Sequence, residues 1–524
     1  MAEENGAGWG SLIRGAGAVA RPRTLLGGAL AIGFVCEALL HAQPPGLGYA
    51  LAALAAALLW WVLGRSLGVR VSKAGLALLA LIVFFSAMVA VRASPPLQML
   101  NLMAGIGLAL LMAAIYVPGA LGQMSFMGYA VGVFLSGLAL VVQPFLLFFG
   151  DLPRAPRGGG RNRAAPLLWG AALALPFLIL FGVLFAAADA VFAGYVRTLF
   201  SWLTDFPHLL ARLVLSLMLA WLALGLARYA FTAEASGADP ARLVKLDFLR
   251  LGGPAAITAL TLVNVLFVAF VAVQAVYLFG GAETLARSGL SHSEYARRGF
   301  FELVTAAALV MALVLLADWL TRFAERRARQ AIALLNALLV LLTLIILASA
   351  LLRMSLYTKE YGLTQLRFYT TAFMFWLAVA LVWLVATVLV SRRSIAPQGR
   401  RHFAFGALVT ALATLTVLNL ANPDALIARV NLERAIAGVG QPLDSAYLTQ
   451  NLGADAVPAS LAALPRLPDA ILRASLACGL LEEEKLLDQQ AIRLTWRGEN
   501  LGNITARRAL AAAHSGLAQT PCPK

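Results

Sequence analysis

The chain has 524 residues, of which 61% are hydrophobic and only 13% are charged, and its mean hydropathy is +0.82. A soluble globule of this size needs more polar residues to cover its surface, so the composition excludes a soluble protein and predicts one embedded in a lipid bilayer. The formal net charge of +16 does not require a nucleic acid partner, because much of it is arginine between apolar segments, where anionic lipid at the cytoplasmic face is the expected neighbour.

Twelve apolar segments are long enough to cross about 30 Å of hydrocarbon as helices, which takes roughly 17 to 25 residues each. Allowing one either way, we expect between 11 and 13 spans. No alternating apolar and polar pattern accompanies them, so the prediction is an all-α transmembrane helix bundle and not a transmembrane barrel. The first segment contains Glu37 and no convincing cleavage site follows it, which argues against a cleavable signal peptide. The segments are 24–42, 47–64, 74–91, 97–117, 128–149, 166–188, 207–227, 254–279, 303–320, 331–351, 370–390 and 403–421.

Arginine and lysine gather in alternate connectors of the second half of the chain. Four cations lie in each of the connectors 150–165, 228–253, 321–330 and 391–402, and the intervening connectors hold fewer. The positive-inside rule therefore predicts that these four connectors face the cytoplasm. Counting spans onward from them places the chain after residue 421 on the outer side.

The first half of the chain disagrees with this count. Arg14, Arg21 and Arg23 precede the first span, and the connector 65–73 is also basic, so both predict a cytoplasmic N-terminus. Counting forward from there puts 150–165 on the outer side instead. Either one segment between 92 and 150 is miscounted or re-entrant, or the weaker charge signal misleads.

Sequence signatures of metal, nucleotide and catalytic sites are absent. The chain contains no HExxH, no Walker-type loop and no GxSxG, and its few histidines and cysteines have no metal-ligand spacing. We therefore expect no cofactor and no metal ion. Cys478 and Cys522 are the only thiols outside the expected spans, and an oxidising compartment permits them to form a disulfide.

Ionisable residues within the expected spans are few. Asp189 and Asp318 lie near helix ends, where anchoring at the interface is the simpler role, whereas Glu37 lies nearer mid-span and is equally compatible with a proton relay. Amides in the spans are expected to hydrogen-bond between helices. These amides are Asn264, Gln274 and Asn336.

The character of the chain changes after residue 421. Asn422 suits a helix N-cap, Pro423 suits the first helical position, and Asp424 complements the positive end of a helix. A new helix is expected to begin there at once. We therefore divide the chain into a basic N-terminal tail, a transmembrane bundle and a small soluble all-helical domain in the periplasm. Their bounds are 1–23, 24–421 and 422–524.

Four stretches resemble an uncharacterised family of polytopic bacterial membrane proteins, a domain of unknown function of the 4153/4173 type. They are ADAVF at 188–192, EYARRGFFEL at 294–303, RMSLYTKEYGLTQLR at 353–367, and NPDALIARVNLERA at 422–435, which continues to LDSAYL and DAVP. The resemblance implies a multi-pass protein of the bacterial inner membrane and brings no activity with it.

The stretch 353–370 is unusually rich in cations and aromatics for a connector. Its aromatic residues recur near helical spacing around Gly362, which predicts a broken helix at the headgroup level with its aromatic side down. An interfacial anchor explains this pattern, and so does a binding surface that it forms with 291–303 and 422–434, held by pairs of opposite charges. The candidate residues of that surface are Glu294, Tyr295, Arg297, Arg353, Tyr357, Tyr361, Arg367, Asn422, Asp424, Asn431 and Arg434.

Three classes of function stay open, and whether the protein is an enzyme stays open with them. The first is a scaffold or regulator of the cell envelope, whose outer face binds a protein partner. The second is a transporter or flippase, although few charges lie at mid-membrane to couple ions. The third is a transferase acting on a lipid-linked substrate, for which no residue spacing selects a site. Its candidate phosphate ligands are Arg297, Arg353 and Arg367, and its candidate bases are Glu294, Asp424 and Asp444.

Overall fold

The structure is a computed structural model. It describes residues 19–116, 121–151, 174, 178, 181–182, 184–199, 207–232, 252–279, 300–320, 326–389 and 398–522. Every regular element within these ranges is a helix, which confirms the all-α prediction. Ten of the described helices are long and apolar enough to cross a membrane, and Glu302–Ala317 is a shorter apolar helix. Of the predicted spans, 166–188 lies mostly outside the described residues.

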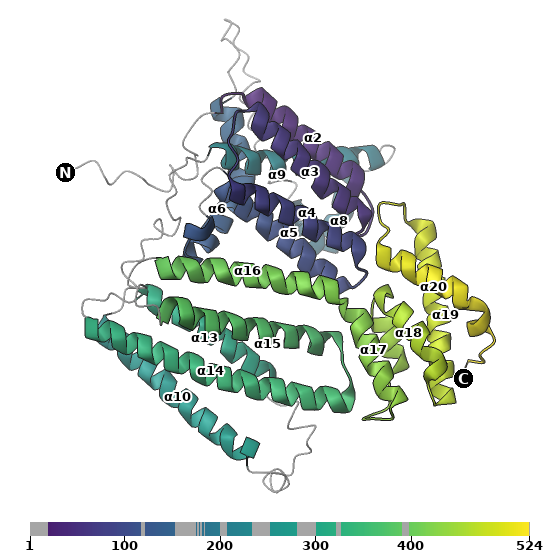
Figure 1. Ribbon diagram of the computed structural model, residues 1–524. Helices are drawn as coiled ribbons and strands as arrows, with labels where there is room; N and C mark the ends of the chain where they lie inside the picture. The colour runs from purple at the N-terminus through teal and green to yellow at the C-terminus, as the bar shows by residue number, and fades with distance from the viewer. Residues whose placement is uncertain are drawn as a thin grey trace, which may run out of the picture.

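The apolar helices form two bundles, and each has its own buried core. The first bundle contains α2 (Pro22–Leu40), α3 (Leu47–Ser66), α4 (Lys73–Val91), α5 (Pro95–Ile115), α6 (Phe126–Leu146) and α9 (Pro207–Thr232). The second contains α10 (Gly253–Phe279), α13 (Phe300–Leu320), α14 (Arg326–Tyr361), α15 (Gln365–Leu384) and α16 (Gln398–Ala421). In Figure 1, α16 lies between the other helices of the second bundle and the first bundle. Its Leu408, Leu412 and Leu415 pack against the core of the first bundle.

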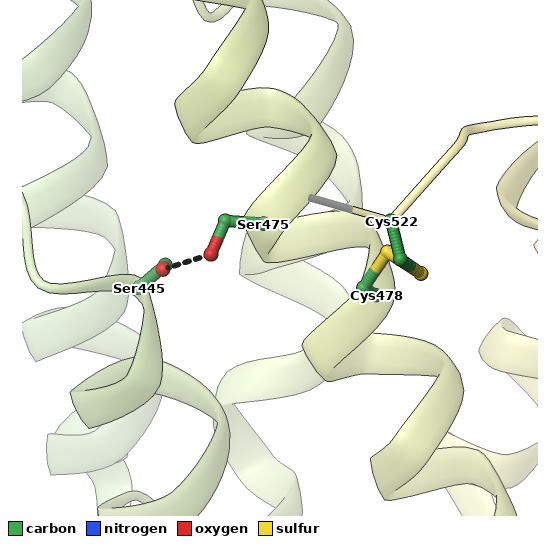
Figure 2. The surroundings of a disulfide bond; sticks show 4 residues. All are labelled: Ser445, Ser475, Cys478 and Cys522. Atoms are coloured by element: carbon green, nitrogen blue, oxygen red, sulfur yellow. Dashed lines mark hydrogen bonds between the residues drawn. A yellow bond between two sulfur atoms is a disulfide. The ribbon is translucent and has the colours of Figure 1, made fainter. Parts of the chain in front are cut away.

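The chain after α16 forms a third body with a core of its own, which we call the tail domain (residues 422–522). It consists of α17 (Pro423–Ile436), α18 (Val457–Ala463), α19 (Ala470–Arg493), α20 (Leu501–Ala518) and short helical turns between them. Asn422 caps α17 by accepting a hydrogen bond from the Ala425 amide, as its sequence predicts. Cys478 on α19 and Cys522 form a disulfide, with their Cα atoms 5.7 Å apart, so the pairing that the sequence permits is present (Figure 2).

The tail domain lies at one end of both bundles, where α2, α4, α14 and α16 end and where α3, α5 and α15 begin (Figure 1). We call this end the tail face, and the other end the opposite face. The Arg21 side chain donates to the Ser66 carbonyl, so the start of α2 and the end of α3 meet on the opposite face. Cations of both halves of the chain lie at helix ends on this face, and these are Arg21, Arg23, Arg65, Lys73, Arg327 and Arg329.

The basic residues of the two halves of the chain, whose predicted sides disagreed, therefore lie on the same face. The disagreement arose because α6 was counted as a span. A Cβ on Gly132, in the second turn of α6, would contact Ala114 at the end of α5. Arg228, near the end of α9, donates hydrogen bonds to Gln143 and Asp151 at the other end of α6. The start of α6 thus lies beside a helix end of the opposite face, and its carboxyl end packs against Trp221 and Arg228 in the second half of α9. The carboxyl end of α6 therefore does not reach the tail face. This is the re-entrant alternative, although α6 is long and apolar enough to span.

Helix α14 is one continuous helix of 36 residues. At 1.5 Å per residue it is about 54 Å long, which is well beyond the thickness of the hydrocarbon layer. Gly362, with a φ of +77°, ends it and begins the turn to α15, which confirms the predicted break. The stretch 353–361 continues the axis of α14 as far as the tail domain, so the part of the connector before the break belongs to the same helix as the preceding apolar segment.

Candidate functional site: the junction of the tail domain with both bundles

The turn between α14 and α15 is held to the tail domain by one buried amide. Asn431 on α17 is only 4% exposed. Its Oδ1 accepts a hydrogen bond from the Leu363 amide at 2.7 Å, and its Nδ2 donates to the Leu363 carbonyl at 2.7 Å. A Cβ at Gly362 would lie 2.6 Å from the Asn431 Oδ1, so only glycine fits at that position. One side chain therefore satisfies both backbone groups of the turn.

Two arginines cap the carboxyl end of α14. Arg434 donates to the carbonyls of Glu360 at 3.0 Å and Gln441 at 2.8 Å, and Arg367 donates to the Gly362 carbonyl at 2.6 Å. The Arg367 guanidinium also lies 4.2 Å from the centre of the Tyr357 ring. The last carbonyls of a helix lack hydrogen-bond partners within the helix and carry partial negative charge. A guanidinium group supplies both the missing donors and a compensating positive charge. Arg434, on α17, therefore joins the helix end to the tail domain, whereas Arg367, on α15, holds the helix end to the turn that follows it.

Two buried carboxylates lie where the tail domain meets the bundles. Asp424 is fully buried and accepts hydrogen bonds from the Gln365 side chain at 2.9 Å and from the Gly453 amide at 2.8 Å. Asp455 is 7% exposed and accepts from the Ala93 amide at 2.8 Å, in the turn between α4 and α5. Asp424 thus contacts the second bundle, and Asp455 contacts the first.

The turn between α2 and α3 provides a further attachment. Leu47 and Gly48 donate their amides to the carbonyls of Glu499 at 2.8 Å and Arg497 at 2.7 Å, and the Arg497 side chain donates to the Ala38 carbonyl. Gly48 must be small here, because a Cβ on it would lie 2.4 Å from the Leu39 carbonyl oxygen. The tail domain is therefore attached to two turns of the first bundle and one of the second.

Beside the junction, the two bundles are joined directly through α5 and α16. The amides of Asn101 and Asn419 donate to each other at 2.8 Å and are fully buried. Arg92, at the end of α4, donates to the Asn419 carbonyl at 2.7 Å. Paired amides of this kind stabilise helix association in membranes, where an unpaired amide has no water to bind. This polar seam lies next to the tail domain.

A groove of about 330 Å³ opens on the tail domain between α17 and α18. One face of α17 lines it with positions three or four residues apart, and small alanine side chains leave the space between the helices open. Its polar lining consists of Asn422, Arg429, Glu433, Asp455 and Arg466. Its apolar lining consists of Ala425, Pro458, Ala459, Ala462 and Ala463.

The predicted surface residues that the structure describes gather at this junction. Arg353 lies half-buried two turns before the end of α14, and Tyr361, which is partly exposed, packs its ring 4.8 Å from that of Tyr357. Glu294, Tyr295 and Arg297 lie outside the described residues. Residues 360–367 thus meet 422–435, whereas no contact of the other predicted segment with this junction falls within the described residues.

The expected pairs of opposite charges are replaced by hydrogen bonds between charged and neutral groups. Within the described part of the chain, Asp424 bonds an amide side chain and a backbone N–H, and Arg434 bonds backbone carbonyls. Charge-assisted hydrogen bonds of this type are strong when water is excluded. Arg367 and Arg434 therefore have structural partners in the chain itself.

Sequence analysis missed the contribution of the first bundle to this site. Asp455 belongs to the DAVP stretch of the family resemblance, so a signal for it existed, but nothing indicated its partner Ala93, 362 residues away. Asp189 of the ADAVF stretch has a local role, because it accepts hydrogen bonds from the amides of Val191 and Phe192 at the start of α8 (Ala190–Leu199). Among the described residues, no group of three or more His, Cys, Asp or Glu could hold a metal ion.

The junction should respond to pH through Asp455. Burial raises the pKa of this carboxyl, and the nearby charge of Asp424 adds to the rise, whereas the Ala93 amide and the charge of Arg92 oppose it. Because its pKa is higher in the folded than in the unfolded chain, the stability that protonation contributes is complete below about pH 4 and is lost as pH rises through the folded pKa.

We therefore expect the unfolding temperature of the wild type to fall more than that of Asp455→Asn as pH rises from about 4 to about 7. The exposed Asp488, on α19, supplies the control variant Asp488→Asn, which should follow the wild type. Parallel curves for the wild type and Asp455→Asn would contradict the assignment.

Comparison with the curated proteins and with the solved structures gives no match. The family model described as Domain of unknown function (DUF4153) matches residues 74–463, which include the described apolar helices from α4 to α16, the helix α17 and the groove up to Ala463. This match covers well over half of the chain and includes both stretches that meet at the junction. The chain is an integral membrane protein of many apolar helices, and it belongs to the DUF4153 family.

Proposed function

We propose that the protein is a scaffold or regulator of the bacterial cell envelope, set in the inner membrane, whose bundles hold the tail domain in the periplasm as a binding surface for a protein partner. The observation that carries this proposal is the attachment of the tail domain to turns of both bundles by Asn431, Asp455 and the backbone of 47–48. Such attachments favour a domain presented in one fixed orientation.

Two independent features support a periplasmic tail face. The opposite face carries cations from both halves of the chain, namely Arg21, Arg23, Arg65, Lys73, Arg327 and Arg329, as expected of a cytoplasmic face under the positive-inside rule. The tail domain carries the disulfide Cys478–Cys522, and disulfides persist in oxidising compartments such as the periplasm.

The polar residues of the bundles support a scaffold over an ion-coupled transporter. Glu37, the candidate for a proton relay, forms a bidentate pair with Arg212 at 2.8 and 3.1 Å, which ties α2 to α9. Gln274 accepts a hydrogen bond from Ser349 at 2.9 Å, which ties α10 to α14. These side chains are used in helix–helix contacts, in which buried polar groups of membrane helices are commonly paired.

Cysteine labelling tests the orientation. In a Cys36→Ala background with the disulfide intact, we expect Ser515→Cys on α20 to react with an impermeant thiol reagent in intact spheroplasts. Ser66→Cys, at the end of α3, should react only after lysis. Both serines are exposed, so accessibility to the reagent depends on the side of the membrane. The reverse pattern would contradict a periplasmic tail.

Photo-crosslinking in living cells tests the scaffold itself. A photoreactive residue at Val439 or Ile471, both exposed on the tail domain, should give one discrete crosslinked protein, identified by mass spectrometry and captured again when that protein carries the photoreactive group. The same residue at Ser66 on the opposite face should not capture it. If neither tail position crosslinks to a protein, the proposed partner does not exist.

A further inference from the structure

We propose that the groove between α17 and α18 binds the phosphate group of an anionic phospholipid headgroup in the adjacent leaflet. The inference rests on the proposed function only in treating the tail face as a binding surface, and it adds a ligand of defined chemistry. The groove volume of about 330 Å³ lies at the lower end of the range of small-molecule pockets, which suits a headgroup.

Two guanidinium groups in the groove are available for an anion. Arg429 and Arg466 both line it and are exposed, and neither side chain forms a hydrogen bond or an ion pair with the part of the chain that the structure describes. This sets them apart from Arg367 and Arg434, whose donors are used on backbone carbonyls. Paired guanidinium groups match the oxygens of a phosphate, each through two parallel N–H donors.

The carboxylates of the groove leave its arginines free. Glu433 follows Arg429 by four residues on α17, yet the two form no salt bridge among the described contacts, and this order of charges is the weaker one on a helix. Asp455 is only 7% exposed, and its carboxylate is occupied by the Ala93 amide. Glu433 is therefore the main source of repulsion for an anion in this groove.

The position of the groove in the chain favours a lipid over a soluble phosphate. Asn422 lines the groove and directly follows Ala421, the last residue of the candidate span His402–Ala421. A groove that begins where a span ends lies at the level of the lipid headgroups, outside the hydrocarbon layer. The alanines and Pro458 that line the remaining wall offer apolar contact for the glycerol backbone of the lipid.

The test uses the purified full-length chain in a neutral detergent, with the ligand-induced rise in unfolding temperature as the readout. Phosphatidylglycerol, phosphatidylcholine, glycerol phosphate and inorganic phosphate are titrated separately. We expect phosphatidylglycerol to give the largest rise, and Arg429→Gln/Arg466→Gln to weaken its apparent affinity at least about tenfold, as the loss of charge-assisted hydrogen bonds implies.

Matched variants separate the groove from general charge effects. Arg493→Gln/Arg508→Gln removes two exposed arginines elsewhere on the tail domain, so it changes the net charge equally and should bind like the wild type. Glu433→Gln should bind more tightly, because it removes the repulsive charge, and a gain of affinity cannot result from damaged folding. Equal weakening by both arginine pairs, or an unchanged affinity in Arg429→Gln/Arg466→Gln and Glu433→Gln, would overturn the proposal.

The soluble ligands identify the source of the phosphate. If glycerol phosphate and inorganic phosphate reproduce the rise given by phosphatidylglycerol, the groove binds free phosphates and the lipid assignment is wrong. Because purified protein is used, the result depends neither on membrane orientation nor on a protein partner. A failed crosslinking or labelling experiment would therefore leave this measurement intact, and failure here would leave the proposed scaffold intact.

Discussion

Replacement of Asn431 by leucine is expected to release the α14–α15 turn from the tail domain. Leucine has nearly the shape of asparagine but leaves the amide and the carbonyl of Leu363 without their partner. A buried backbone group without a partner costs about 1 to 3 kcal/mol, so the loss of both partners should cost the junction about 2 to 6 kcal/mol. This is a large fraction of the stability of a typical domain.

Limited proteolysis measures this release. Trypsin should cleave Asn431→Leu rapidly after Lys359 or Arg367, which flank the turn; in the wild type the backbone of Lys359 lies beside Gly440 of the tail domain. Asn431→Asp keeps an acceptor for the Leu363 amide but loses the donor to the Leu363 carbonyl. Its rate of cleavage by trypsin should therefore lie between those of the wild type and of Asn431→Leu. The control Asn451→Leu changes an exposed asparagine of the same domain. If Asn431→Leu resists trypsin as well as the wild type does, the two hydrogen bonds of Asn431 to Leu363 are not needed to hold the turn.

Reduction of Cys478–Cys522 is expected to destabilise the tail domain with little effect on the bundles. The bond closes a loop with a sequence separation of 44 residues and joins the chain end to α19 (Figure 2). Loop-closure entropy for a loop of this length gives about 4 kcal/mol, within the usual range of about 2 to 5 kcal/mol for a native disulfide. The disulfide should therefore decide whether α20 stays packed.

Thermal unfolding with and without a reductant checks this result. The reduced protein and Cys522→Ser should unfold at the same lowered temperature, whereas Cys36→Ser, which alters a cysteine outside the disulfide, should retain a response to the reductant. Hydrogen exchange should locate the loss of protection in α19 and α20. Equal unfolding temperatures for the oxidised and reduced protein would show that the core of the tail domain suffices without the bond.

The helices were predictable because bilayer thickness and apolar length are linked by simple geometry. The start of α17 was equally predictable, because Asn422 as N-cap and Pro423 as first helical residue are preferences that depend only on the first turn of the helix. The path of α6 was not, because a re-entrant helix and a span have the same composition. Only its contacts, such as that of Arg228 with Gln143, reveal where its ends lie.

The junction itself was predictable only in part. The family resemblance indicated 353–367 and 422–435, and both lie there, but their arginines were expected to pair with acids or to hold a ligand. Arg434 and Arg367 instead bond the carbonyls that end α14. Such a role depends on where a helix ends in space. The attachment of Asp455 to Ala93 joins residues 362 positions apart, and no local pattern can indicate that contact.

The three turns that attach the tail domain have a mechanical consequence. A rigid body touched at three points that are not in line has no freedom left to pivot, and here two of the points, 41–48 and 92–94, belong to the first bundle while 360–367 belongs to the second. Any sliding of one bundle past the other would therefore strain the hydrogen bonds that attach the tail domain to the three turns. The relative position of the bundles and the binding of a ligand to the tail domain would then be coupled in both directions, so that a bound ligand would restrict the movement of one bundle past the other.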